Sequence, residues 1–255
     1  MDVQWTSIII GFATGAVTGA LVTYFRHWLA RRRQTESMEF ARAQESDRIR
    51  REHYERALAY ERTRESLRGC DLAGRDLAGL YLGRADLQRA NLSGADLSNS
   101  SLKEANLIGA DLRRANLTGA NLTETALEGA NLEGANLQSA ALKAANLAGA
   151  SLQRADLRNT AFEDTNLEWA DLQKVQLQGA ELKKANMEAA RLQRANLQGA
   201  NLKGVNLAEA RLEGANLQGA NLKKANLTGA HLRGAKVDSS TVMPKDWEGV
   251  VASKP

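Results

Sequence analysis

Few side chains in this chain are of the types that catalyse reactions or bind metals. The three histidines, His27, His53 and His231, lie far apart in the sequence, and Cys70 is the only cysteine. A zinc site needs three or four converging thiolate, imidazole or carboxylate ligands, and a disulfide needs two cysteines. The glycines lack the strand-to-helix context of a phosphate-binding loop. We therefore expect no enzymatic activity, no metal site and no cofactor.

Charged side chains that could bind a partner recur at multiples of twenty residues. A coil of that length would stack them on one outward face, interrupted by Glu163, with Glu104, Glu124 and Asp164 beside its first half. Acidic protein surfaces and anionic lipid headgroups are the expected partners of such a face. The candidate binding residues on it are Lys103, Lys143, Lys183, Lys184, Lys203, Lys223 and Lys224.

The same twenty-residue period sorts the other outward positions. An adjacent face is expected to carry arginine and lysine, the next one glutamine, and the fourth one glutamate. Trp169 lies on the acidic face and is the candidate for a protein contact, because exposed tryptophan is enriched at interface centres. Duplication of repeats would also sort charges by face, so the sorting alone does not establish binding. The basic face carries Arg114, Arg154, Lys174 and Arg194. The glutamine face carries Gln138, Gln178, Gln198 and Gln218, and the acidic face carries Glu128, Glu168, Glu188 and Glu209.

A strict period of five residues must position these faces. From Leu67 to Val237 every fifth residue is large and apolar, and a second register two residues earlier is mostly alanine. This period fits neither a helix nor a strand. It predicts a coil that turns a corner every five residues and closes in twenty. Parallel pairing between coils at roughly 4.8 Å would build a rod of roughly 40 Å. Glycine two positions after the leucine suits the tight turns.

The repeating unit is Ala-Asn/Asp-Leu-x-x, as in 85–87, 90–92 and 195–197. This unit resembles the pentapeptide-repeat family. The resemblance implies an all-β solenoid, a right-handed quadrilateral β-helix, over residues 67–240. It does not imply a single function. Some members of the family are DNA mimics that protect or inhibit DNA gyrase.

Residues 1–30 are predicted to be a transmembrane anchor. Val3 to Phe25 contains no charged residue over 23 positions, which is about 35 Å of helix and enough to span a bilayer. Asp2 precedes this segment and Arg26 follows it, with more arginines at 31–33. This asymmetry predicts a single-pass protein of a bacterial inner membrane, with the repeats on the cytoplasmic side. A cleaved signal peptide is the competing interpretation, although it would need positive charge before the apolar core.

Within the predicted span, Gly11, Gly15 and Gly19 lie four residues apart. Such spacing places small residues on one helix face, where a second helix can approach closely. The protein could therefore be a homodimer, or the second helix could belong to another protein. Glycine is also simply common in membrane helices.

Two further segments are expected to flank the repeats. Residues 31–66 are rich in Arg, Glu, Gln and Ala, which favours a charged helix, and its last turn would cover the first coil. This helix is either a spacer or a weak coiled coil. Residues 241–255 would form a C-terminal cap and tail, with an apolar plug of Val242, Met243, Trp247, Val250 and Val251. Cys70 lies in the small inward register and stands in for alanine.

The favoured function is a membrane-tethered interaction or scaffold module without catalysis. It would present a rigid rod at the cytoplasmic face to an unidentified protein partner. A gyrase-directed DNA mimic is the first alternative, but it requires an acidic rod, whereas this chain has a net charge of +4 and a pI near 9.3. Binding of nucleic acid or another anionic surface by the basic faces is the second. Nucleic acid is the less expected ligand, because no stacking aromatics accompany the charges.

Overall fold

The computed structural model describes residues 18–245 and 247, with the backbone alone for residues 18–24. Contacts divide the chain into two units, 1–49 and 50–255. The one α-helix in the described part of the chain is α2, Thr18–Thr63, which runs without interruption across the predicted boundary at residue 30.

Helix α2 forms where the sequence favours it. Thr18–Thr63 contains no proline, and Gly19 in its first turn is its only glycine. Local ion pairs support the exposed part, such as Arg32 Nε to Glu36 Oε1 at 2.9 Å. The helix ends at Arg64, whose backbone is left-handed with φ of 55° and whose N–H donates to the Tyr60 carbonyl at 2.8 Å. A left-handed residue is a common helix terminator.

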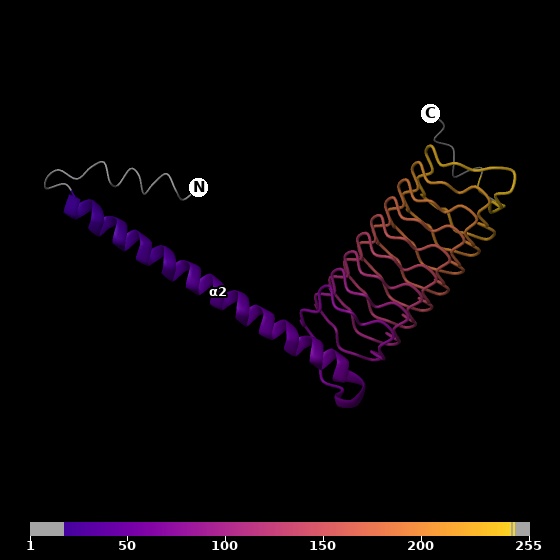
Figure 1. Cartoon of the computed structure of the whole chain (residues 1–255). Helices are drawn as coiled ribbons and strands as arrows, with labels where there is room; N and C mark the ends of the chain where they lie inside the picture. The colour runs from indigo at the N-terminus through magenta and orange to yellow at the C-terminus, as the bar shows by residue number, and fades with distance from the viewer. Residues whose placement is uncertain (1–17, 246, 248–255) are drawn as a thin grey trace. The chain divides into compact units, whose positions relative to one another are not determined.

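Beyond the helix, the chain winds into a rod of stacked coils (Figure 1). Parallel bridges join each residue before an inward leucine to the one twenty positions later, from Asp71↔Asn91 to Asn216↔Lys236. Four such bridges per coil correspond to the four predicted sides. No continuous strand forms in the described residues, because a corner every five residues leaves only a single bridged residue per side. The pairing of the predicted all-β solenoid therefore consists of isolated bridges.

Every backbone N–H of a typical repeat has an acceptor, as residues 91–95 show. Asn91 N–H donates to Cys70 in the coil before, while those of Leu92 and Gly94 donate to the coil after, all at 2.7–2.9 Å. Ala95 N–H donates to the Leu92 carbonyl at 3.0 Å and closes the turn. The remaining N–H, on Ser93, donates to the Asn91 side-chain oxygen at 3.2 Å. Where Asn or Asp precedes the leucine, its side chain thus completes the backbone pairing of the repeat.

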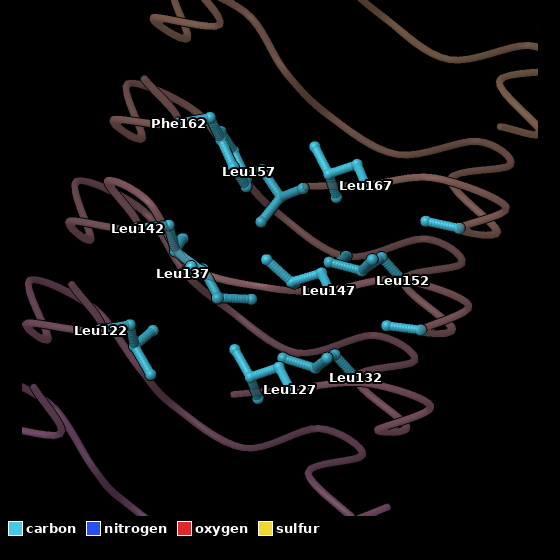
Figure 2. Close-up of a cluster of buried hydrophobic side chains, with 14 of the residues drawn as sticks. Leu122, Leu127, Leu132, Leu137, Leu142, Leu147, Leu152, Leu157, Phe162 and Leu167 are labelled. Carbon is cyan, nitrogen blue, oxygen red and sulfur yellow. The ribbon is translucent and has the colours of Figure 1, made fainter. Parts of the chain in front are cut away.

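The rod interior is filled by the leucine and alanine registers, as predicted. Figure 2 shows Leu122, Leu142 and Phe162 one above the other in successive coils. All three are fully buried. Thr125 and Thr160 interrupt the alanine register and are also buried, and each donates its hydroxyl to a leucine carbonyl of the coil before at 2.8 Å. A buried hydroxyl paired in this way costs little. Cys70 lies in the same register and is buried, as predicted.

The last turns of α2 cover the first coil, at the place where the sequence predicts an N-terminal cap. Ala57 and Tyr60 belong to the buried core. Tyr54 donates its hydroxyl to the Asp76 carbonyl at 3.1 Å, and His53 Nδ1 accepts the Asp71 N–H at 2.9 Å. The helix thereby hides the apolar end of the solenoid and binds polar groups at its edge.

The C-terminal end differs from the prediction. One extra residue enters the last coil, so Val242 bridges to Asn221, twenty-one positions earlier. This shift moves Val242 out of the inward register, and it is 45% exposed, so its predicted place in the plug is wrong. Met243 and Trp247 do pack against the core, as expected of a cap. Val250 and Val251 lie outside the described residues.

No helix in the described part of the chain is long and apolar enough to cross a membrane. The predicted span at 3–25 lies largely outside the described residues, as do Gly11 and Gly15 of the predicted dimer face. Gly19 lies in the first turn of α2.

Candidate interaction surfaces

The candidate binding residues are positioned by one recurring corner of the coil. The second residue after each inward leucine has a positive φ, between 54° and 70°, whether or not it is glycine. Glycine adopts this left-handed conformation without strain, whereas other residues pay roughly 1–2 kcal/mol. The sequence predicts the glycines at this corner. It gives no sign that arginine, lysine and tryptophan share their conformation.

The predicted lysine residues stack on one face, the lysine face, which comprises the outward positions of 101–104, 121–124, 141–144, 161–164, 181–184, 201–204 and 221–224. Bridges such as Asn201↔Asn221 hold its coils in register. Lys103 lies 3.4 Å from Glu104, which also accepts a hydrogen bond from Arg84 at 2.8 Å. That hydrogen bond lowers the pKa of Glu104. The first half of the face is therefore neutralised by its own acidic residues.

The second half of the lysine face keeps its positive charge. Lys183 pairs with Glu181 at 3.2 Å. The other lysines of this half, Lys184, Lys203, Lys223 and Lys224, form no ion pair with any described residue. Glu181 is the only acidic residue among 181–184, 201–204 and 221–224. We name this set the lysine patch: Lys183, Lys184, Lys203, Lys223 and Lys224.

Trp169 lies on the tryptophan face, which comprises the outward positions of 86–89, 106–109, 126–129, 146–149, 166–169, 186–189, 206–209 and 226–229. Its side chain is 66% exposed. The indole Nε1 donates to Glu168 Oε1 at 2.7 Å. At the same corner, Gly149 and Ala189 occupy the neighbouring coils, so the ring stands above small residues.

The predicted arginine face lies opposite the lysine face. Segments 101–105 and 111–115 are two corners apart in a four-sided coil, so the prediction that they are adjacent is wrong. Arg113 is bound bidentately by Asp111, which lowers the pKa of that carboxyl group. Arg154 lies 3.6 Å from Glu133. A shallow depression of about 610 Å³ lies between these side chains, over Gly94 and Gly134.

The repeats match a family model described as pentapeptide repeats, in overlapping segments from residue 66 to residue 241. This match covers more than half of the chain. The chain belongs to the pentapeptide-repeat family. Its coiled fold is the right-handed β-helical solenoid of that family.

Two solved structures resemble the chain, and the first is described as that of a pentapeptide-repeat protein. HetL, involved in heterocyst differentiation regulation in the cyanobacterium Nostoc sp. strain PCC 7120, is 34% identical, with 66% of this chain and 85% of HetL covered and a TM-score of 0.38. QnrB1, a plasmid-mediated fluoroquinolone resistance protein, is 17% identical, with 64% of this chain and 92% of QnrB1 covered and a TM-score of 0.52. The second likeness concerns the fold alone. A comparison with curated proteins finds no match.

The residues with catalytic or metal-binding potential do not converge in this pentapeptide-repeat protein. His53 serves the N-terminal cap, Cys70 is buried inside the rod, and burial raises the pKa of its thiol. His231 lies at the bridge position of a late coil, paired with Arg211. The described residues contain no group of three His, Cys, Asp or Glu side chains that could hold a metal ion.

Sequence reasoning missed the ladder formed by the residue before each inward leucine. On the tryptophan face, asparagine occupies this position in five successive coils, and each amide donates to the oxygen of the one before at 2.9–3.4 Å. The near-regular Asn or Asp at this position was the available signal. The ladder consists of Asn146, Asn166, Asn186, Asn206 and Asn226.

Proposed function

We propose that this pentapeptide-repeat protein is a non-catalytic binding module whose tryptophan face contacts a protein partner at a membrane. The observation that carries the proposal is the state of Trp169. It is exposed, it adopts a left-handed backbone conformation with φ of 61°, and it lies on the face that carries Glu128, Glu168, Glu188 and Glu209.

The fold does not account for Trp169. More than half of the corners with positive φ hold residues other than glycine, arginine and lysine among them, so Trp169 is set apart by its large exposed indole and not by its backbone conformation. An indole that is 66% exposed gains little packing in return for the strain. A binding role would supply the missing compensation, since tryptophan is among the strongest contributors at interfaces.

The surroundings of Trp169 indicate the chemistry of the partner. From 106 to 229 the tryptophan face contains four glutamates and no lysine, arginine or aspartate, whereas its first coils carry Arg68, Asp86 and Arg89. None of these glutamates forms an ion pair within the described part of the chain. A carboxylate rim around an exposed indole favours an arginine-bearing segment, because arginine can bind carboxylates bidentately and stack on tryptophan. The four residues are Glu128, Glu168, Glu188 and Glu209.

The membrane location rests on the sequence of residues 3–25 and on the arginines that follow it. A tether would restrict the module to partners close to the membrane. Helix α2 would then separate the anchor from the repeats, since the side chains of 30–52 are exposed. The proposed topology places the repeats in the cytoplasm, and a dimer through Gly11, Gly15 and Gly19 remains part of the same proposal.

The gyrase-directed DNA mimic is less well supported. A mimic must reproduce the dense negative charge of duplex DNA. In the rod, lysine and arginine slightly outnumber aspartate and glutamate, and basic residues occupy two opposite faces. Nucleic-acid binding lacks the aromatic platforms that usually accompany basic residues.

The test is site-specific photo-crosslinking in cells. A photoreactive amino acid replaces Trp169 in one variant and Ser139 in a matched control, because Ser139 lies at the same corner position of another face with φ of 57°. We expect one protein to be captured at position 169 only. The purified partner should then bind the natural chain and lose roughly tenfold or more in affinity for Trp169→Gly.

Equal capture at both positions would contradict the proposal. So would undiminished binding of the captured protein to Trp169→Gly. Because glycine relieves the strained corner, misfolding of this variant is not expected to confuse the result.

A further inference from the structure

The lysine patch is a compact array of positive charge. Lys183, Lys203 and Lys223 share one corner position in three successive coils, which spans roughly 10 Å at the usual strand spacing. Lys184 and Lys224 lie beside them at the next position, and Gly204 occupies that position between them. Five ammonium groups are thus held on a small area by a backbone that cannot spread them apart.

The patch is not neutralised by the protein itself. Within the described residues only Lys183 has an acidic partner, Glu181, and this carboxylate also accepts a hydrogen bond from Asn201 at 2.8 Å. In the other half of the same face the positive charges are neutralised, because Glu104 there binds both Arg84 and Lys103. A partner of opposite charge is therefore expected at the patch.

The shape of this side of the rod suits a planar partner. No residue is inserted between the coils from Leu67 to Lys236, as the unbroken twenty-residue register of the bridges shows. Between 67 and 236, therefore, no loop projects beyond the lysine side chains. The large apolar residues of 181–184, 201–204 and 221–224, which are Leu182, Leu202 and Leu222, are fully buried, so these segments expose no anchor for a protein interface. Flat, purely electrostatic contact is typical of basic segments on anionic leaflets.

We infer that the lysine patch docks the rod onto the anionic lipid headgroups of a membrane surface. The inference rests on the proposed location at a membrane, but not on the proposed protein contact at Trp169. Docking would lay one side of the rod against the bilayer, while the tryptophan face at the neighbouring corner remains a separate surface.

Lysine footprinting on the full chain tests this inference. The protein is incorporated into vesicles of phosphatidylcholine alone, or with about a quarter phosphatidylglycerol, and is acetylated briefly by a membrane-impermeant reagent. Mass spectrometry then gives the acetylation rate of each lysine. We expect the patch lysines to react roughly fivefold more slowly in the anionic vesicles, and the protection to vanish in about 1 M salt. Lys174, on the opposite face, is the internal control and should react equally in both.

Charge reversal supplies a matched pair of variants. Lys183→Glu, Lys203→Glu and Lys223→Glu together should abolish the protection of Lys184 and Lys224. The same number of reversals on the opposite face should leave that protection unchanged. Equal thermal midpoints of the two variants establish that both remain folded. The control carries Arg154→Glu, Lys174→Glu and Arg194→Glu.

Three results would overturn the inference. The first is equal acetylation of the patch in neutral and anionic vesicles, or equal slowing of Lys174. The second is the same protection when inorganic phosphate is added to neutral vesicles, which would show binding of a small anion. The third is protection in isolated cell membranes but not in protein-free anionic vesicles, which would indicate an acidic protein. None of these results bears on crosslinking at Trp169.

Discussion

The lysine face and the tryptophan face cover the same interior but are built differently. Beneath both, leucines such as Leu167 and Leu182 are fully buried. On the tryptophan face, asparagine precedes the leucine in five successive coils and forms a continuous ladder. On the lysine face the same position holds Ser101, Ala141 and Glu181 among others, and the ladder is interrupted.

The difference shows how a repeat protein separates stability from binding. The interior and the bridges are set by two inward registers, which hardly vary between faces. The outward positions can therefore differ without altering the coil. Charges on the lysine face are partly paired with one another, whereas the glutamates of the tryptophan face have no cationic partner in the described residues. We expect substitutions of inward residues to change the stability of the rod equally beneath the two faces. Substitutions of outward residues should change it by different amounts.

The largest effect should be the same on both faces. Leu167→Ala and Leu182→Ala each remove a fully buried side chain, and each should lower the free energy of unfolding by about 3 kcal/mol. Urea denaturation of the two variants measures this. A clear inequality between them would break the comparison, because the interior beneath the two faces would then not be equivalent.

The asparagine ladder should distinguish the faces. Asn206 takes part in four hydrogen bonds, to Asn186, Glu188, Ala208 and Asn226. Asn206→Ala should cost about 2 kcal/mol of unfolding free energy, at about 0.5 kcal/mol per bond.

The matched variant on the lysine face is Asn201→Ala. Asn201 takes part in two hydrogen bonds, one to Glu181 and one from Lys203 N–H. Its loss should cost about 1 kcal/mol. Equal losses for Asn201→Ala and Asn206→Ala, measured in the same urea titration, would show that the continuous ladder adds nothing.

The corner conformation predicts changes of opposite sign in adjacent coils of the tryptophan face. Gly149 has a φ of +64° and open space around an added Cβ, so Gly149→Ala should cost about 1 kcal/mol through backbone strain alone. Trp169→Gly relieves the same strain and should stabilise the rod by about 0.5 kcal/mol. Thermal melting measures the sign of the stability change in both variants. A destabilised Trp169→Gly would mean that the indole supports the fold, and would weaken the argument for binding.

The smallest effect concerns acid sensitivity of the lysine face. The hydrogen bond from Arg84 lowers the pKa of Glu104 below its usual 4.5. This pair therefore stabilises the folded state above pH 4.5 and loses its contribution as the pH falls through the lowered pKa. Glu104→Gln should flatten the fall of the melting temperature in that range. Arg84→Gln should do the same, and the double variant should add nothing further.

The structure bears out the sequence most closely where the pattern is local and repeated. The leucine period, the alanine register and the glycine corners each follow from burial or from backbone geometry, and Cys70 took its expected place. The extra residue before Val242 was not visible, because Val242 itself continues the spacing of five. Apolar periodicity alone cannot distinguish a continued coil from a coil with one added residue.

The interior of this protein can be read from the sequence alone, because a strict period of five admits only one arrangement of inward and outward positions. Glu104 beside Lys103 is also visible in the sequence, since the two are neighbours in the chain. Stacking of the coils adds the second partner of this carboxylate, Arg84, which lies twenty residues earlier. The tertiary structure also placed Trp169 in a strained corner. Both outcomes depend on side chains and backbone brought together by stacking, which adjacent letters of the sequence do not specify.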